Sequence, residues 1–180
     1  MKKTLAILFE KSIDAGDETY SDDQLKSKWI GNPPATIEEI TETENRLGIE
    51  LPKDYKEMLM ISNGFPTCNN AVEPTFQKVN KIDYYRHYER NCLEYWTNGD
   101  ELNEVKELNE VKEDIERSIL IAGLEDEQQF LIIQPSTRNE NWKYWKFAYW
   151  IPGEEQYDDL KNYLESVIEF LDEQIEENKK

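Results

Sequence analysis

The chain has 180 residues, of which 39 are acidic and 21 are basic, and its formal net charge is −18. A field of this sign repels phosphate backbones, so direct binding to DNA or RNA is not expected. Five Trp, ten Tyr and six Phe concentrate apolar area in few side chains, which excludes a disordered chain. The length is that of one domain.

The first 28 residues contain a short apolar run, residues 5–9, that follows two lysines. The run imitates a signal peptide, but it is short and lacks a small-residue cleavage site. Neither this run nor any later window has the length that a membrane span needs, so no membrane association is expected. We expect residues 1–28 to be an extension packed on a domain of residues 29–180.

Residues 36–48 carry the signals of a capped helix. The Thr36 side chain can accept from the Glu39 amide while the Glu39 carboxylate reaches back to the Thr36 amide. Gly48 supplies the left-handed residue that ends the helix. The apolar residues expected on its buried face are Ile37, Ile40 and Leu47.

A second helix is predicted directly afterwards. Pro52 suits the first helical position because its missing amide would have no helical partner. Asn63 and Gly64 end the helix. The stripe predicted to face the core consists of Tyr55, Met58, Leu59 and Ser62.

The order of these helix signals resembles the SUKH superfamily, whose founding members are the yeast Smi/Knr cell-wall assembly regulators. The resemblance spans residues 29–173. It also includes a strand, glycine turn and strand around Gly123, and a closing helix with Phe170 and Leu171 near its end. Thr43 departs from the family pattern, which has an apolar residue there. The motif residues with structural explanations are Thr36, Ile40, Glu44, Gly48, Pro52, Tyr55, Asn63 and Gly64.

The middle of the chain has weaker signals. Residues 75–79 are predicted as a strand, and residues 81–95 as a helix because apolar residues recur at spacings of three and four. A tandem hexapeptide at residues 101–112 predicts a helix with one apolar stripe and an acidic outer face. Two readings of that helix stay open, a duplicated surface helix and a partner-binding helix.

Residues 119–124 and 130–134 are apolar runs separated by an acidic turn, which predicts a pair of strands. Residues 142–150 predict a strand covered on both faces, since its aromatic residues point to both sides. An amphipathic helix is predicted over residues 157–176. The fold class is therefore α+β, a single domain with a mostly antiparallel sheet, an N-terminal helix-turn-helix pair and a C-terminal helix.

Catalytic and metal-binding readings find little support in the sequence. His87 is the one histidine, and its spacing to Cys68 and Cys92 matches no zinc pattern. His87 is expected to be exposed or locally hydrogen-bonded and the two cysteines to be small buried hydrophobic residues, and no metal, cofactor or catalytic residue is expected. The aromatic strand is read as core, with a stacking platform for a base or sugar as the alternative. Two cysteines favour a reduced, cytoplasmic protein.

The resemblance implies a non-catalytic binding module, because bacterial SUKH proteins are frequently immunity proteins that neutralise a toxin, often a nuclease. The acidity fits a basic protein partner, although it equally serves solubility. The alternatives are a cytoplasmic scaffold or regulator, as the yeast members are, and an enzyme with a concave site near His87. The candidate partner-binding residues are Glu104, Glu107, Glu110, Glu125, Asp126, Glu127, Glu154, Glu155 and Asp158.

Overall fold

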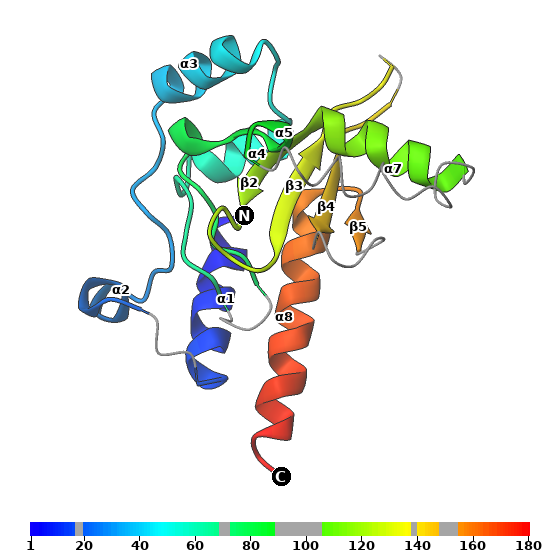
Figure 1. Cartoon of the computed structure of the whole chain (residues 1–180). Helices are drawn as coiled ribbons and strands as arrows, with labels where there is room; N and C mark the ends of the chain where they lie inside the picture. The colour runs from blue at the N-terminus through cyan, green and yellow to red at the C-terminus, as the bar shows by residue number, and fades with distance from the viewer. Residues whose placement is uncertain (17–19, 69–72, 89–105, 138–139, 148–154) are drawn as a thin grey trace.

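The computed structural model describes the chain except for residues 17–19, 69–72, 89–105, 138–139 and 148–154 (Figure 1). Its centre is an antiparallel sheet of five strands in the order β1-β2-β3-β4-β5. The strands are β1 (Asp83–Tyr84), β2 (Ser118–Ala122), β3 (Gln129–Ile133), β4 (Lys143–Phe147) and β5 (Gln156–Tyr157). With the helices around it, the sheet forms a single-domain α+β fold, as the sequence predicts.

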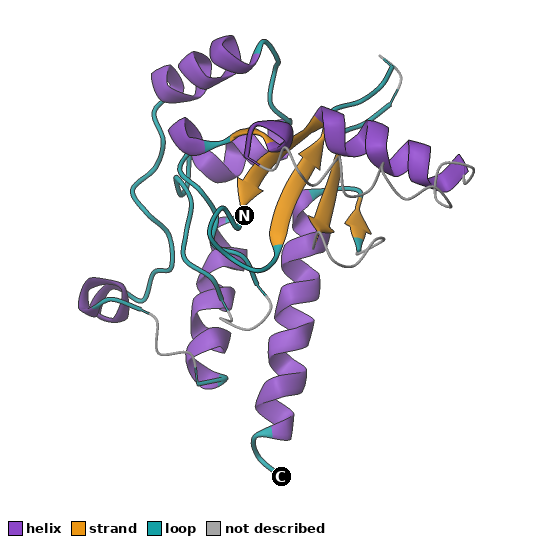
Figure 2. Ribbon diagram, in the orientation of Figure 1, coloured by secondary structure: helices purple, strands orange, loops and turns teal. Residues whose placement is uncertain are grey.

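Helices cover both faces of the sheet (Figure 2). The larger core takes Tyr144 of β4 together with residues of α1 (Lys2–Asp14), α3 (Ile37–Leu47), α4 (Lys53–Leu59) and α8 (Leu160–Glu177). A smaller core on the other face takes Trp145 of β4 and residues of α5 (Tyr85–Tyr88) and α7 (Lys106–Arg117). The prediction that β4 is covered on both sides is therefore confirmed for the described part of that strand.

The N-terminal helix α1 packs side by side with the C-terminal helix α8 (Figure 1). Leu5, Leu8 and Phe9 of α1 are buried in the larger core. Lys11 forms an ion pair with Asp172 of α8. The short helix α2 (Asp22–Ser27) follows, capped by Ser21. The domain boundary at residue 28 stays a prediction.

The first helix of the predicted pair, α3, begins and ends where its signals place it. The Thr36 hydroxyl accepts from the Glu39 amide at 3.2 Å, the Glu39 carboxylate accepts from the Thr36 amide at 2.8 Å, and Gly48 has φ +70°. The predicted stripe is wrong at Ile37, which is 68% exposed because the first turn projects beyond the core. Thr43 is buried instead, and its hydroxyl donates to the Val79 carbonyl at 3.2 Å.

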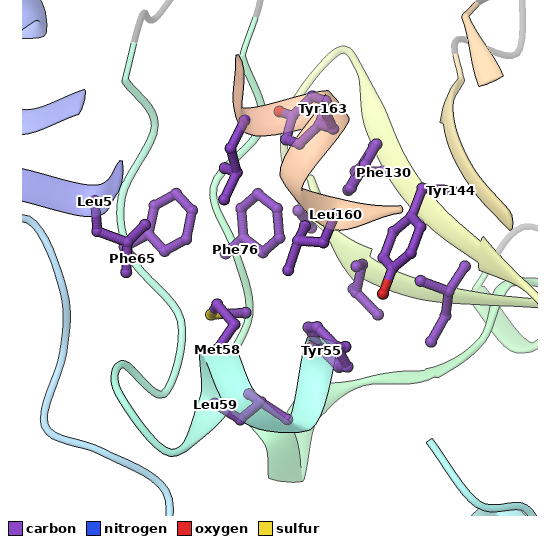
Figure 3. Packing of buried hydrophobic residues seen from close by; sticks show 14 of the residues in the cluster. Leu5, Tyr55, Met58, Leu59, Phe65, Phe76, Phe130, Tyr144, Leu160 and Tyr163 are labelled. Atoms are coloured by element: carbon purple, nitrogen blue, oxygen red, sulfur yellow. The ribbon is translucent and has the colours of Figure 1, made fainter. Parts of the chain in front are cut away.

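The second helix, α4, starts one residue later than predicted, because Pro52 is its N-cap with an extended ψ of 143°. All four residues of its predicted stripe are buried, but the helix ends at Leu59, so Ser62 lies beyond it and the prediction that Asn63 and Gly64 end the helix is wrong. Figure 3 shows Tyr55 and Met58 on the side of α4 that faces the aromatic rings of the larger core. The chain turns at Gly64, where φ is +79°.

Two predictions in the middle of the chain are wrong. Residues 75–79 form no strand, because Phe76 makes only isolated bridges with Phe65 and Ala122 before a 3-10 turn, η1 (Val79–Lys81), begins. The helix predicted from residue 81 is replaced in its first part by β1 and the single turn α5, since Asp83 and Tyr84 pair with β2. Residues 89–95 of that prediction lie outside the described part of the chain.

The strand pair β2 and β3 follows the sequence closely, whereas the C-terminal helix starts three residues later than predicted. Of the tandem repeat, residues 106–112 belong to α7, while residues 101–105 lie outside the described part. The C-terminal helix starts at Leu160, after Tyr157 has paired with Tyr144 in a β5 strand that the sequence did not indicate. Asp159 caps this helix by accepting from the Asn162 amide at 2.8 Å.

Candidate partner-binding surface

The carboxylate of Asp54 lies where α4, β4 and α8 meet. It accepts hydrogen bonds from the Tyr144 hydroxyl at 2.7 Å and from the Leu160 amide at 2.9 Å. Burial and the neighbouring Asp54 carboxylate raise the pKa of Tyr144 well above its usual range, so the hydroxyl stays protonated and keeps donating. These contacts make Asp54 a structural residue that joins three elements.

A second internal carboxylate, Glu73, also has structural partners. Glu73 accepts from the Lys146 ammonium at 2.8 Å and from the Tyr163 hydroxyl at 2.6 Å. Burial, followed by the negative charge of Glu73, raises the pKa of Tyr163. The ion pair is almost fully buried and holds the loop before Phe76 against β4 and α8.

His87 and Cys68 do not come together in a reactive arrangement. His87 is exposed on α5, and its Nδ1 lies 3.1 Å from the Asp83 carboxylate, whereas Cys68 is buried in the larger core. Cys92 lies outside the described residues. Within the described part of the chain, no group of three His, Cys, Asp or Glu side chains is placed to hold a metal ion.

The acidic turn between β2 and β3 presents two of its three predicted contacts to solvent. Glu125 and Glu127 are exposed. Asp126 is half-buried, and its carboxylate accepts from the Thr75 amide at 2.7 Å. Gly123 makes the turn tight, because a Cβ there would lie 2.1 Å from the Gln128 carbonyl oxygen. The structure therefore gives Asp126 an internal bond and leaves its neighbours open to a partner.

The pairing of the strands shows where the other predicted partner-binding residues lie. Gln129, which follows the acidic turn, lies opposite Phe147, and the Lys146 amide donates to the Glu155 carbonyl at 3.0 Å. Exposed Glu155 thus lies at the same end of the sheet as the acidic turn, and Asp158 is also exposed. Glu107 and Glu110 belong to α7, whereas Glu104 and Glu154 lie outside the described residues.

The opposite end of the sheet carries a hollow that the sequence did not indicate. There α7 ends beside β2, and Ile133 lies opposite Lys143. The hollow has a volume of about 340 Å³ and lies over the turn between β3 and β4. We call it the turn hollow. Its lining includes Ile49, Glu50, Pro135, Ser136, Glu140 and Trp142. Sequence reasoning missed it because Trp142 was assigned to a strand and because Glu50 lies far from this turn in the chain.

A carboxylate in this hollow is held in place by the turn itself. Glu140 accepts from the Ser136 hydroxyl at 2.6 Å and from the Ser136 amide at 3.0 Å. These bonds hold the pKa of Glu140 below its usual range, so the carboxylate is charged at neutral pH. A second hollow of the same volume adjoins this one and shares Glu140 as a wall.

The sheet, the helix-turn-helix pair and the closing helix define an acidic α+β domain whose interior carboxylates are used for packing. No helix in the described ranges is long and apolar enough to cross a bilayer. The chain belongs to the SMI1 / KNR4 family (SUKH-1), whose family model matches residues 34–173. Among curated proteins, none matches the chain.

Proposed function

We propose that this protein is a non-catalytic binding module that neutralises a basic protein partner, a cognate bacterial toxin, by covering its surface in the cytoplasm. The observation that carries the proposal is the family match, because the SUKH superfamily includes toxin-neutralising immunity proteins. The net charge of −18 favours a partner whose surface is positively charged. Carboxylates of the module compete with substrate phosphates for the Lys and Arg side chains of a nuclease.

Exposed carboxylates at one end of the sheet supply the long-range electrostatic attraction that steers the partner toward this protein. Glu125, Glu127 and Glu155 lie at that end and remain accessible. Rim charges of this kind raise the association rate and its dependence on salt more than they raise affinity. An interface of ordinary size covers about 800 Å² on each partner.

A second candidate function is a scaffold or regulator of cellular proteins, as the Smi/Knr regulators are. The same family match favours it, since the family is named after those regulators. The two candidates differ in the partner, which is a toxin in the first and a cellular assembly in the second.

Co-expression with a toxin encoded next to this chain's gene, once such a gene is located, tests the proposal. We expect the chain to restore growth and to co-purify with the toxin, and a double variant, Glu125→Lys with Glu127→Lys, to associate more slowly at low salt. The matched control, Glu173→Lys with Glu176→Lys on the exposed side of α8, carries the same change of charge and is expected to leave association unchanged. Failure of both rescue and co-purification would overturn the toxin assignment.

A further inference from the structure

The surface where α3 begins and α4 ends carries four exposed apolar residues. Ile37 is 68% exposed and Met60 is 45% exposed. Pro33 and Pro34, which precede α3, are also exposed. We call these four residues the proline patch. Single exposed apolar side chains are ordinary on a protein surface, whereas a contiguous group of them is typical of a contact with another protein.

A backbone hydrogen bond joins the two parts of the proline patch. The Ala35 amide donates to the Leu59 carbonyl at 2.9 Å, so the start of α3 lies beside the end of α4 (Figure 1). Pro34 directly precedes Ala35, and Met60 directly follows Leu59. Ile37 is only two residues beyond Ala35. The exposed apolar side chains therefore belong to one surface of the molecule.

The proline patch is rigid before any partner arrives. The proline rings fix φ at Pro33 and Pro34. The Pro33 carbonyl also accepts a hydrogen bond from the Asn63 amide at 3.3 Å. The capping box at the start of α3 fixes the turn from which Ile37 projects. A surface that is fixed in this way loses little conformational entropy on binding.

Acidic residues flank the proline patch along α3. Glu38 directly follows Ile37, and Glu42 lies one turn beyond Glu38. Both glutamates are exposed, and neither forms an ion pair with a described residue. On α4, Glu57 lies 3.9 Å from Lys53 in an exposed pair that water screens. The rim on the α3 side is therefore negative, and it suits an apolar side chain that projects from a positively charged surface.

The same rim disfavours a second copy of this chain as the occupant. A two-fold contact through the proline patch would bring the patches of both copies together, and with them the side chains of Glu38 and Glu42. Like charges that meet across an interface oppose association. The charges therefore favour a basic protein as the occupant.

We infer that the proline patch is the apolar anchor of the interface with the basic partner. Ile37 and Met60 contact an apolar side chain of that partner, and the acidic rim contacts its Lys and Arg residues. The inference rests on the proposed function and deepens it. The exposed carboxylates at the end of the sheet steer the partner, whereas the proline patch supplies affinity.

The test uses the purified chain and a peptide probe, so it needs no toxin. The probe is a fluorescein-labelled amphipathic helical peptide of Leu and Lys, and the control peptide has Ser in place of Leu and the same charge. Fluorescence anisotropy at physiological ionic strength measures binding. We expect saturable binding of the Leu-Lys peptide and none of the Ser-Lys peptide. No saturable binding, or equal binding of the two peptides, would overturn the inference.

Variants localise the binding. Ile37→Ser with Met60→Ser should weaken binding of the Leu-Lys peptide about tenfold, whereas Leu25→Ser should leave it unchanged. Leu25 is the matched control because it is 46% exposed on α2, which lies away from α3 and α4 (Figure 1). Equal affinities of the double variant and the control would overturn the inference.

The single variant Ile37→Ser keeps this test decisive if the double variant folds poorly. Ile37 is mostly exposed, so its replacement removes little packing from the core. Circular dichroism checks that each variant is folded. Ile37→Ser should still bind the Leu-Lys peptide more weakly than the unaltered chain does, and an unchanged affinity in this folded variant would count against the proline patch.

Sedimentation velocity at low salt tests the other occupant. We expect the unaltered chain to sediment as a monomer, because its copies repel one another. A dimer that dissociates in the double variant would assign the proline patch to a second copy of the chain and overturn the inference.

Co-expression with the toxin separates this inference from the proposed function. If the unaltered chain restores growth, Leu25→Ser should restore it and the double variant should not. Full rescue by the double variant would remove the proline patch from the interface and leave the proposed function standing. Patch-dependent binding of the Leu-Lys peptide without any rescue of growth would remove only the toxin assignment.

Discussion

Asp54 accepts a hydrogen bond from the Tyr144 hydroxyl across 2.7 Å, although the two residues are 90 positions apart in the chain. The same carboxylate accepts from the Leu160 amide at the start of α8. One side chain of the helix-turn-helix pair therefore fixes both the sheet and the C-terminal helix.

Replacing Asp54 with Ala leaves the Tyr144 hydroxyl and the Leu160 amide without their acceptor. We expect the free energy of unfolding to fall by about 3 kcal/mol, the sum of a lost helix cap and a buried unsatisfied hydroxyl. Asp54→Asn keeps one acceptor oxygen and should lose less than half of that. Urea denaturation measures both, and equal losses would contradict the bonding role.

Lys146→Met removes the cation from the buried pair with Glu73. We expect a loss of about 3 kcal/mol, because an uncompensated carboxylate is left in the interior. Adding Glu73→Gln to this variant should recover much of the loss, since the second change removes the stranded charge. A double-mutant cycle by urea denaturation gives the coupling, and strictly additive effects would argue against a buried ion pair.

Gly64→Val should destabilise the fold strongly. Its φ is +79°, and a Cβ there would lie 2.5 Å from the Phe76 carbonyl oxygen, so backbone strain and a clash together cost about 4 kcal/mol. Gly48→Ala is the control, because its φ of +70° is similar but no atom lies within 4 Å of the new Cβ. We expect the control to cost about 1 kcal/mol. Thermal melting ranks the two, and the reverse order would be inconsistent with the clash.

Reversing the charges of Glu125 and Glu127 should leave the melting temperature unchanged, because both side chains are exposed. Asp126→Ala in the same turn should lower it, because the Thr75 amide loses its acceptor, at a cost of about 1 kcal/mol. Differential scanning calorimetry compares the variants. A melting loss in the charge-reversed chain would show that the two glutamates are not free surface residues.

Stability should fall as the pH rises above about 10. In the folded chain, burial raises the pKa of Tyr144 and Tyr163 above the ordinary 10.0, so the unfolded chain loses these protons first. The stabilisation that the two protonated tyrosines contribute is fully present below the pKa that tyrosine has in the unfolded chain. It is lost as the pH rises from there toward the higher pKa that each tyrosine has in the folded chain. Tyr144→Phe should reduce this slope by about 0.7 kcal/mol per pH unit on average between pH 9 and 11, measured by urea denaturation. An unchanged slope would contradict the assignment.

Local signals explain the parts of the fold that the sequence predicted. Thr36, Glu39 and Gly48 act on their own helix through bonds between near neighbours, so their roles follow from spacing alone. Periodicity was less reliable at Ile37, because a helical stripe specifies a direction but not how far along the helix the core extends. Thr43 departs from the apolar pattern because its hydroxyl meets the Val79 carbonyl, an acceptor 36 residues away.

Long-range contacts decide the elements and sites that the sequence missed. Strand β5 contains two residues, and only its pairing with β4 makes it a strand. Glu73 and Lys146 are 73 positions apart, and no local pattern distinguishes them from the other charged residues. The turn hollow likewise combines Ile49 and Glu50 with a turn much further along the chain. Exposure of Glu125 and Glu127, by contrast, followed from their place in a charged turn.

The packing of α1 against α8 has a consequence for biosynthesis. Translation delivers Leu5, Leu8 and Phe9 well before α8, the helix that packs against them. The nascent chain therefore exposes these apolar side chains until α8 has been synthesised, and such a surface binds chaperones and promotes aggregation. A truncation of the chain before Leu160 would leave them exposed permanently.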